Sequence, residues 1–453
     1  MLNRKIGLSM FFCVVMMSLL MVVPAFAQEP INVPVWIAFT DANRLGWAQD
    51  RAAEFNEMFP QYNVSVEGYA NYEELFAATA LASEQDSLPA IVQYFEVATQ
   101  DARDSGYFKS IAEALAGRTE VNGIAVNMDD FIAPVAAYYT LDGQFTSMPW
   151  NTSSAIWFSN MNILSEAGID TPPATWGEIE AACEAIMALE NAPEYCFTWP
   201  NHGWFFEQWL AQEDGTFANN DNGRTERATE VTFNSEAGVA VLTWLQDMHD
   251  QGYLYYSGAQ GGDSWGTVDQ AFGAGQVAMA AYSSSDTRVY TETGAANGVD
   301  VRASFLPYND ETGWTGNLIG GASLWLVDGL STEVEDGALS FLLFLSSTEN
   351  AASWHQLTGY IAIRESAIDL LTEQGWFDEN PNFRVASDQL SQSTITPATS
   401  GALVGAFPSI RNVVTQAIDT VLLTPDADPA TVLDEAAAEA NTILSEYNLL
   451  NAE

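Results

Sequence analysis

Short apolar runs alternate along the chain with longer stretches in which apolar residues recur every three or four positions. The first pattern is typical of strands, and the second is typical of amphipathic helices. Near the N-terminus the pattern predicts strands at residues 31–39, 62–69 and 88–95, with helices at 47–58 and 72–84 between them. This strand-helix-strand order indicates parallel pairing and an α/β layered fold.

The alternation continues through the middle of the chain and then gives way to helices. It predicts strands at 155–158 and 277–281 and helices at 176–189, 235–251, 333–345, 348–357, 366–374 and 429–447. A chain of 453 residues is too long for one ordinary core. Because no internal repeat or long linker separates the elements, we expect two lobes with several crossings of the chain between them.

The first 27 residues have the pattern of a secretory signal peptide. Arg4 and Lys5 precede an apolar run that ends in a small-residue site at residues 25–27. We therefore expect cleavage after Ala27 and a protein that is periplasmic or extracellular. The alternative is an uncleaved membrane anchor.

The charge balance narrows the range of partners. The chain has 14 Lys+Arg against 60 Asp+Glu, a formal net charge of −46. Nucleic acid and anionic lipid surfaces are poor partners for such a protein. Any anion site must be local and built from few cations.

Two cysteines remain after the expected cleavage. Cys183 lies in a predicted helix, and Cys196 begins the strand that follows it. Outside the cytoplasm a disulfide between them is the expected state, and two buried thiols are the alternative.

Motifs for metal-dependent or phosphate-loop chemistry are missing from the sequence. It contains neither GxxxxGK[ST] nor HExxH, and the three histidines are isolated from one another. With 60 acids, carboxylate pairs that resemble those of glycosidases arise by chance. We therefore expect no enzyme, no metal and no cofactor; a secreted hydrolase is the alternative from another class.

What remains is a set of loops rich in aromatic, small and polar residues, as in small-molecule clefts. They read ANYEEL, AIVQYFEV, MPWNTSSAIWFSN, HGWFFEQW, AAYSSSD, GNLIGGASLW, SWHQLTGYIAI and FPSIRNVV. Together with PPATWGE and TEQGWFDENPN, most of these words resemble, in order, the periplasmic substrate-binding proteins of sugar-type ABC importers (family 1, maltose-binding-protein-like). The narrower resemblance is to the subgroup that binds sn-glycerol 3-phosphate.

The resemblance implies an α/β, two-lobed periplasmic-binding-protein fold (type II) with a ligand cleft between the lobes and multiple hinge crossings. We expect an N-terminal lobe of residues 28–140 plus 284–335 and a C-terminal lobe of 141–283 plus 336–453. Carried over to this sequence, the ligand-binding residues are Tyr72, Glu96, Ser153, Trp176, Trp204, Ser283, Gly321, Tyr360 and Arg411.

Their chemistry suits a glycerophosphate. Arg411 is expected to contact the phosphate, and Glu96 to accept hydrogen bonds from glycerol hydroxyls. Gly320 and Gly321 are expected to let the main chain approach the ligand, where a Cβ would intrude.

The resemblance therefore implies a monomeric binding protein that delivers glycerol 3-phosphate, or a glycerophosphodiester such as glycerophosphocholine, to a membrane permease. The alternative within the same family is an oligosaccharide-binding protein, since several tryptophans are available to stack on sugar rings.

Overall fold

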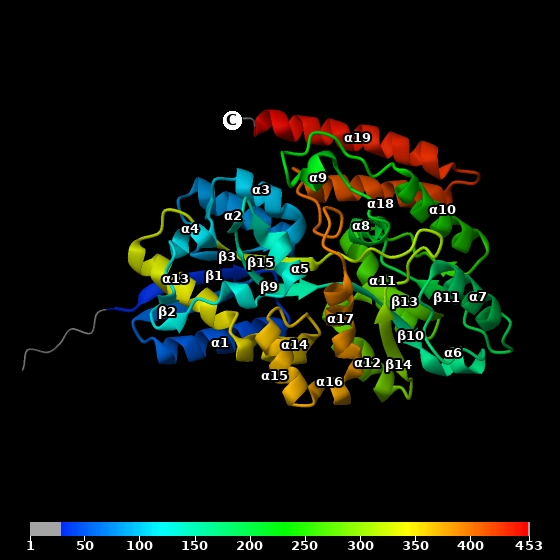
Figure 1. Ribbon diagram of the computed structural model, residues 1–453, viewed down its shortest axis with the longest axis horizontal. Coiled ribbons are helices and arrows are strands. Elements are labelled where there is room, and N and C mark those ends of the chain that lie inside the picture. The colour runs from blue at the N-terminus through cyan, green and yellow to red at the C-terminus, as the bar shows by residue number, and fades with distance from the viewer. Residues whose placement is uncertain (1–28, 452–453) are drawn as a thin grey trace, which may run out of the picture.

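Two β-sheets form the centres of two lobes, which lie side by side in the computed structural model (Figure 1). The structure describes residues 29–451, so the expected signal peptide lies outside the described residues. The first sheet has the strand order β2-β1-β3-β15-β4, with β9 beside β15. Its strands are β1 (Ile31–Ile37), β2 (Tyr62–Gly68), β3 (Ile91–Phe95), β4 (Phe108–Lys109), β9 (Met148–Ser153) and β15 (Gly320–Val327). β1 pairs in parallel with both β2 and β3, which confirms the predicted parallel pairing.

The second sheet has the strand order β12-β11-β13-β10-β14. Its strands are β10 (Ala155–Asn160), β11 (Tyr195–Thr198), β12 (Leu254–Tyr255), β13 (Val277–Ser283) and β14 (Val301–Phe305). β11 is parallel to β12 and β13, whereas β10 is antiparallel to β13 and β14.

The chain crosses between the sheets more than once. Ser154 alone separates β9 of the first sheet from β10 of the second, and residues 306–319 lead back from β14 to β15. A further crossing follows α16 (Trp376–Glu379), after which α17 (Val385–Gln392) packs beside β10 and β14. These crossings confirm the expected two-lobed architecture.

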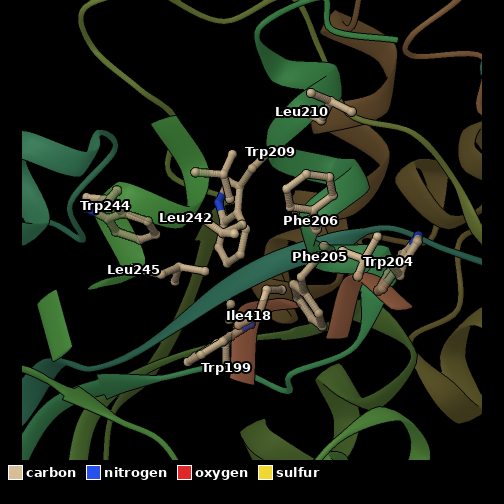
Figure 2. Close-up of a cluster of buried hydrophobic side chains, with 14 of the residues drawn as sticks. Trp199, Trp204, Phe205, Phe206, Trp209, Leu210, Leu242, Trp244, Leu245 and Ile418 are labelled. Carbon is tan, nitrogen blue, oxygen red and sulfur yellow. The ribbon is translucent and has the colours of Figure 1, made fainter. Parts of the chain in front are cut away.

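Each sheet is covered by helices that bury one apolar face. In the first lobe, α1 (Arg44–Met58) and α13 (Thr332–Leu345) pack against the sheet around Phe55 and Phe341. In the second lobe the core lies among α8 (Gly203–Gln212), α10 (Glu236–Asp250), α18 (Phe407–Leu423) and α19 (Pro429–Leu450). Figure 2 shows part of this second core, with Trp204 and Trp244 at opposite sides of the cluster.

The expected lobe boundaries do not follow the sheets. β14 belongs to the second sheet rather than to the first lobe, and β9 belongs to the first sheet rather than to the second lobe. The helices α13, α14 (Thr348–Thr358) and α15 (Glu365–Glu373) pack on the first core, although residues 336–453 were expected in the second lobe. Helical periodicity identifies the apolar face of a helix, but not which of two sheets that face covers.

Two segments expected as loops are the first turns of helices. HGWFFEQW lies in α8, and FPSIRNVV begins α18. All ten residues of α8 are buried, so its sequence has no polar face to reveal the helical period.

The expected disulfide is confirmed. Cys183 in α7 (Trp176–Met187) is bonded to Cys196 at the start of β11, with the two Cα atoms 5.3 Å apart. The bond joins a covering helix of the second lobe to its sheet.

Candidate functional site

A cleft of about 400 Å³ lies where elements of the two lobes meet. Its lining from the first lobe comes from the first turns of α1 and α2 (Tyr72–Glu84), the end of β3, the end of β9 and the start of β15. The second lobe contributes α8, α11 (Ser264–Gly273) and the segment after β13. The lining residues are Arg44, Asn71, Tyr72, Glu73, Phe95, Glu96, Ser153, His202, Trp204, Gly262, Trp265, Tyr282, Ser283, Ser285, Asp286, Gly321 and Tyr360.

Seven of the nine residues predicted from the sequence lie in this lining. They are Tyr72, Glu96, Ser153, Trp204, Ser283, Gly321 and Tyr360. The fold brings them together from positions almost 290 residues apart. The other two, Trp176 and Arg411, do not line the cleft.

Two phenols provide neutral donors on the first-lobe wall. Asn151 Nδ2 donates to the Tyr72 hydroxyl at 3.1 Å, and the Tyr72 ring stacks on Phe95 with ring centroids 4.6 Å apart. The Tyr360 ring stacks on Trp354 with a centroid distance of 5.6 Å. Burial raises the pKa of both tyrosines above the usual range, so both hydroxyls keep their protons at neutral pH.

A buried cluster of one cation and two carboxylates lies directly behind the cleft. Arg411 Nη2 donates to Glu96 Oε1 at 2.9 Å, and Arg411 Nε donates to Glu207. All three side chains are at least nine-tenths buried. Glu96 follows β3 of the first lobe, whereas Glu207 and Arg411 lie on α8 and α18 of the second, so the cluster joins the two lobes.

The burial of this cluster favours protonation of Glu96. Burial raises the pKa of Glu96 to about 7, because Arg411 offsets only part of that effect and Glu207 adds repulsion. Burial also raises the pKa of Glu207. Glu96 Oε2 makes no hydrogen bond with the described protein and belongs to a residue of the cleft lining. It is therefore available to accept a ligand hydroxyl.

The glycines at the start of β15 have structural reasons for being glycine. A Cβ on Gly320 would lie 2.5 Å from the Trp204 indole, and a Cβ on Gly321 would lie 1.9 Å from the Asn151 carbonyl oxygen. Gly321 also has φ +98°. These glycines therefore let the main chain of β15 lie close to α8 and β9 of the protein itself. Gly321 also lines the cleft.

Hydroxyls and a carboxylate follow β13 on the second-lobe wall. The Ser285 hydroxyl lies 2.9 Å from Ser283 Oγ and 2.7 Å from Asp286 Oδ2. Ser283 Oγ also accepts from the Ser285 backbone N–H at 3.2 Å. This short turn presents two hydroxyls and one acid to the cleft. Burial raises the pKa of Asp286.

Sequence reasoning missed Arg44, which lines the cleft at the first turn of α1. Its Nε donates to Asp41 Oδ2 at 2.6 Å, and its guanidinium lies 4.6 Å from the Phe39 ring centroid. The signal that could have found it is its place at the start of the helix that follows β1, because ligands of α/β sheets bind at the carboxyl ends of the strands. Trp265 and His202 were also missed; burial lowers the pKa of His202 to about 3, so its ring is neutral.

Trp176 lies elsewhere in the second lobe. Its ring stacks on Trp244, with centroids 4.7 Å apart. Trp244 lies on the opposite side of the aromatic cluster from Trp204, which lines the cleft (Figure 2). Trp176 thus does not line the cleft in which seven of the predicted residues meet, because a tryptophan at the start of a helix indicates burial without indicating against what.

One hydrolase-like sequence pattern, GxSxG at residues 262–266, lies beside the cleft. Ser264 is 1% exposed, and its hydroxyl donates to the Gly261 carbonyl at 2.6 Å. A 3₁₀ turn precedes it, whereas a nucleophile elbow requires a strand there. Ser264 is thus built as a helix start.

Residues 29–451 contain neither a cluster of side chains suited to a metal ion nor a helix suited to span a membrane. No group of three or more His, Cys, Asp or Glu side chains in this range is arranged to hold a metal ion. No helix in the same range is both long and apolar enough to cross a bilayer.

Both the family comparison and the most similar relatives identify the chain as similar to solute-binding proteins. Residues 50–385 match the family described as bacterial extracellular solute-binding protein. The sn-glycerol-3-phosphate-binding periplasmic protein UgpB of Salmonella typhimurium is 31% identical over 427 residues, which cover 92% of this chain and 93% of that protein. The UgpB of Escherichia coli K12 is 30% identical over 433 residues, covering 93% and 94% of the two chains.

Solved structures resemble this one across nearly its whole length. The structure of UgpB from Mycobacterium tuberculosis in complex with glycerophosphocholine has a TM-score of 0.74 at 20% identity, covering 92% of this chain and 99% of that one. The sugar-binding protein MalE of Xanthomonas citri has a TM-score of 0.75 at 19% identity, covering 93% and 100%. At these identities the structural likeness concerns the fold alone.

Proposed function

The chain belongs to the family of bacterial extracellular solute-binding proteins, and from that premise we propose that it is the substrate-binding component of an ABC importer. Its ligand is sn-glycerol 3-phosphate or a glycerophosphodiester such as glycerophosphocholine. The protein captures this ligand outside the cytoplasm and delivers it to the permease subunits in the membrane.

The convergence of hydrogen-bonding groups on the cleft carries this proposal. The phenols of Tyr72 and Tyr360 and the hydroxyls of Ser153 and Ser283 all belong to the lining. The ionised oxygens of a phosphate accept hydrogen bonds and cannot donate them, so a phosphate suits a wall of O–H and N–H donors. Glu96 offers the complementary acceptor for the hydroxyls of a glycerol end.

The position of the cleft suggests how the ligand is enclosed. Tyr72 and Tyr360 belong to the first lobe, whereas Trp204 and Ser283 belong to the second. A ligand that bonds both walls stabilises the closed arrangement of the lobes more than the open one, and hinge closure follows from this difference. The permease can then distinguish loaded from empty protein by its shape.

An oligosaccharide is the second candidate ligand, and one observation favours it. The indoles of Trp204 and Trp265 both line the cleft, with ring centroids 6.3 Å apart. Apolar faces of sugar rings pack on such surfaces, and Glu96 and Asp286 would accept sugar hydroxyls.

Calorimetric titration of the purified chain from Gln28 onward separates the two ligands. We expect saturable binding of glycerol 3-phosphate or glycerophosphocholine and none of maltose. The reverse result would overturn the glycerophosphate assignment. After overnight incubation the recovered glycerophosphocholine should be intact, since we propose binding without catalysis. Vesicles carrying the cognate permease should take up the solute only when the loaded protein is present.

A further inference from the structure

We infer that Gln93 and Asn151 are positioning residues, which fix the hydroxyl of Tyr72 as a hydrogen-bond donor toward the ligand. This role rests on the proposed function and deepens it, because it explains how the first-lobe wall comes to offer donors to a phosphate. The side chains of Gln93 and Asn151 are fully buried and lie outside the cleft lining. They act through Tyr72, which belongs to that lining.

The hydrogen bonds of this pair start from a group whose polarity is fixed. Ala38 follows β1, and its backbone N–H donates to Gln93 Oε1. Because a backbone N–H can only donate, the carbonyl oxygen of the Gln93 side chain must face it. The amide nitrogen of Gln93, which can only donate, is then the group that meets the next partner.

Asn151 on β9 passes this polarity on to the cleft. Gln93 Nε2 donates to Asn151 Oδ1 at 2.8 Å, and Asn151 Nδ2 donates to the Tyr72 hydroxyl at 3.1 Å. Each amide therefore accepts on one side and donates on the other. Turning either amide over would set two N–H groups against each other in a buried place, where no solvent can replace the lost bond.

The hydroxyl hydrogen of Tyr72 is what remains for the ligand. The oxygen already accepts from Asn151, and the hydroxyl donates to no other described residue. Burial raises the pKa of Tyr72, so the hydrogen stays in place at neutral pH. The ring is held by stacking on Phe95, with centroids 4.6 Å apart. A ligand acceptor in the cleft is thus the partner that this hydrogen can reach.

Asn151 also faces the second phenol of the same wall. Burial raises the pKa of Tyr360, and the Arg44 guanidinium and the Asn151 amide oppose that rise. Protein donors therefore face both phenol oxygens of the first-lobe wall, which favours hydroxyl hydrogens that point to the ligand. An ionised phosphate oxygen accepts hydrogen bonds and cannot donate them, so it matches such a wall.

A double-mutant cycle, with calorimetric titration of glycerol 3-phosphate and glycerophosphocholine, tests the role of the pair. Tyr72→Phe should lose about 10- to 100-fold in affinity, as expected for a hydrogen bond to a charged group. Gln93→Met keeps the length of the side chain but frees Asn151 to turn its oxygen toward Tyr72. A phenol donates more readily than it accepts, so the hydroxyl then turns inward. In that background Tyr72→Phe should change the affinity by only about twofold.

Gln212→Met is the matched control for a lost buried amide. Gln212 is 1% exposed, donates from Nε2 to the Leu306 carbonyl at 2.9 Å and does not line the cleft. In this background Tyr72→Phe should keep its full cost in affinity. If Gln93 has a merely structural role, the two losses add and Tyr72→Phe keeps its full cost in Gln93→Met as well. That result would overturn the positioning role.

Two further outcomes separate this role from the proposed function. If the unmodified protein binds a glycerophosphate and Tyr72→Phe binds it equally well, the positioning role is wrong and the function stands. If the unmodified protein binds maltose and neither glycerophosphate, the function is wrong and the role falls with it. Should Gln93→Met not fold, NMR of the unmodified protein should show nuclear Overhauser contacts between the Asn151 side-chain amide protons and the Tyr72 ring. Their absence would overturn the assigned orientation.

Discussion

Replacing Glu96 by glutamine should change how the stability of the ligand-free protein depends on pH. Glu96 is 1% exposed, and its pKa is raised from the ordinary 4.5 to about 7, chiefly by burial. Below about pH 4.5 the carboxyl is protonated in both folded and unfolded chains and makes no difference. Between about 4.5 and 7 the folded chain holds a proton that the unfolded chain releases, so the free energy of unfolding falls as the pH rises.

The size of this loss follows from the two pKa values. The interval from 4.5 to about 7 corresponds to about 3 kcal/mol, fully developed above about pH 7. Glutamine has no proton to lose in this range. Measured against Glu96→Gln, the unmodified protein should therefore lose about 3 kcal/mol between about pH 4.5 and pH 8.

Urea unfolding followed by tryptophan fluorescence at several pH values measures this difference. Glu57→Gln is the control, because Glu57 is exposed on α1 and its replacement removes the same formal charge. The free energy of unfolding of the control should depend on pH in the same way as that of the unmodified protein. The curve for Glu96→Gln should diverge from both as the pH rises. Parallel curves for all three proteins would refute the argument that burial keeps Glu96 protonated.

The same carboxyl links ligand binding to protons. Hydroxyl donors from a ligand favour the ionised form of Glu96, so binding below about pH 7 should release a proton and tighten as the pH rises toward that value. Titrations in two buffers with different ionisation enthalpies reveal that release. Its absence in Glu96→Gln would assign it to this residue.

Four further changes probe the framework around the cleft. Replacing Cys183 and Cys196 by serine should lower the free energy of unfolding by about 3 kcal/mol in urea titrations, since the bond closes a short loop. Gly321→Ala should cost about 2 kcal/mol or more in thermal unfolding because of its φ of +98° and the carbonyl 1.9 Å from the new Cβ. Gly46→Ala, in open space on α1, should instead stabilise by about 0.5–1 kcal/mol. Trp176→Phe should leave the calorimetric affinity within about twofold, because Trp176 does not line the cleft.

The elements that the sequence predicted well have one buried face and one exposed face. The helix predicted at residues 72–84 has those bounds in the structure, and the strand predicted at 62–69 is one residue shorter. In both, the alternation between apolar and polar positions reports the environment directly. In α8 every residue is buried, so no alternation between apolar and polar positions marks the helix in the sequence.

Most of the residues predicted for the site do lie in the cleft, but their contacts with one another could not be predicted from the sequence. Resemblance placed Glu96 and Arg411 in the same site, yet nothing local in the sequence marks Glu207 as the second partner of Arg411. The two contacts of Arg411 join residues separated by 204 and 315 positions. Whether a cation faces a ligand or a carboxylate depends on such distant pairings, which appear only once the lobes are assembled.

The strong acidity of the chain does not argue against an anionic ligand, because the charges act over different distances. At physiological ionic strength, interactions between exposed charges are screened over about 8 Å, so most of the surface carboxylates have little influence inside the cleft. Contacts within a few ångströms are screened much less. The charges that matter for capture are therefore those in the cleft lining, Arg44, Asp286 and Glu96. A formal charge of −46 then slows the approach of a phosphate without preventing its capture.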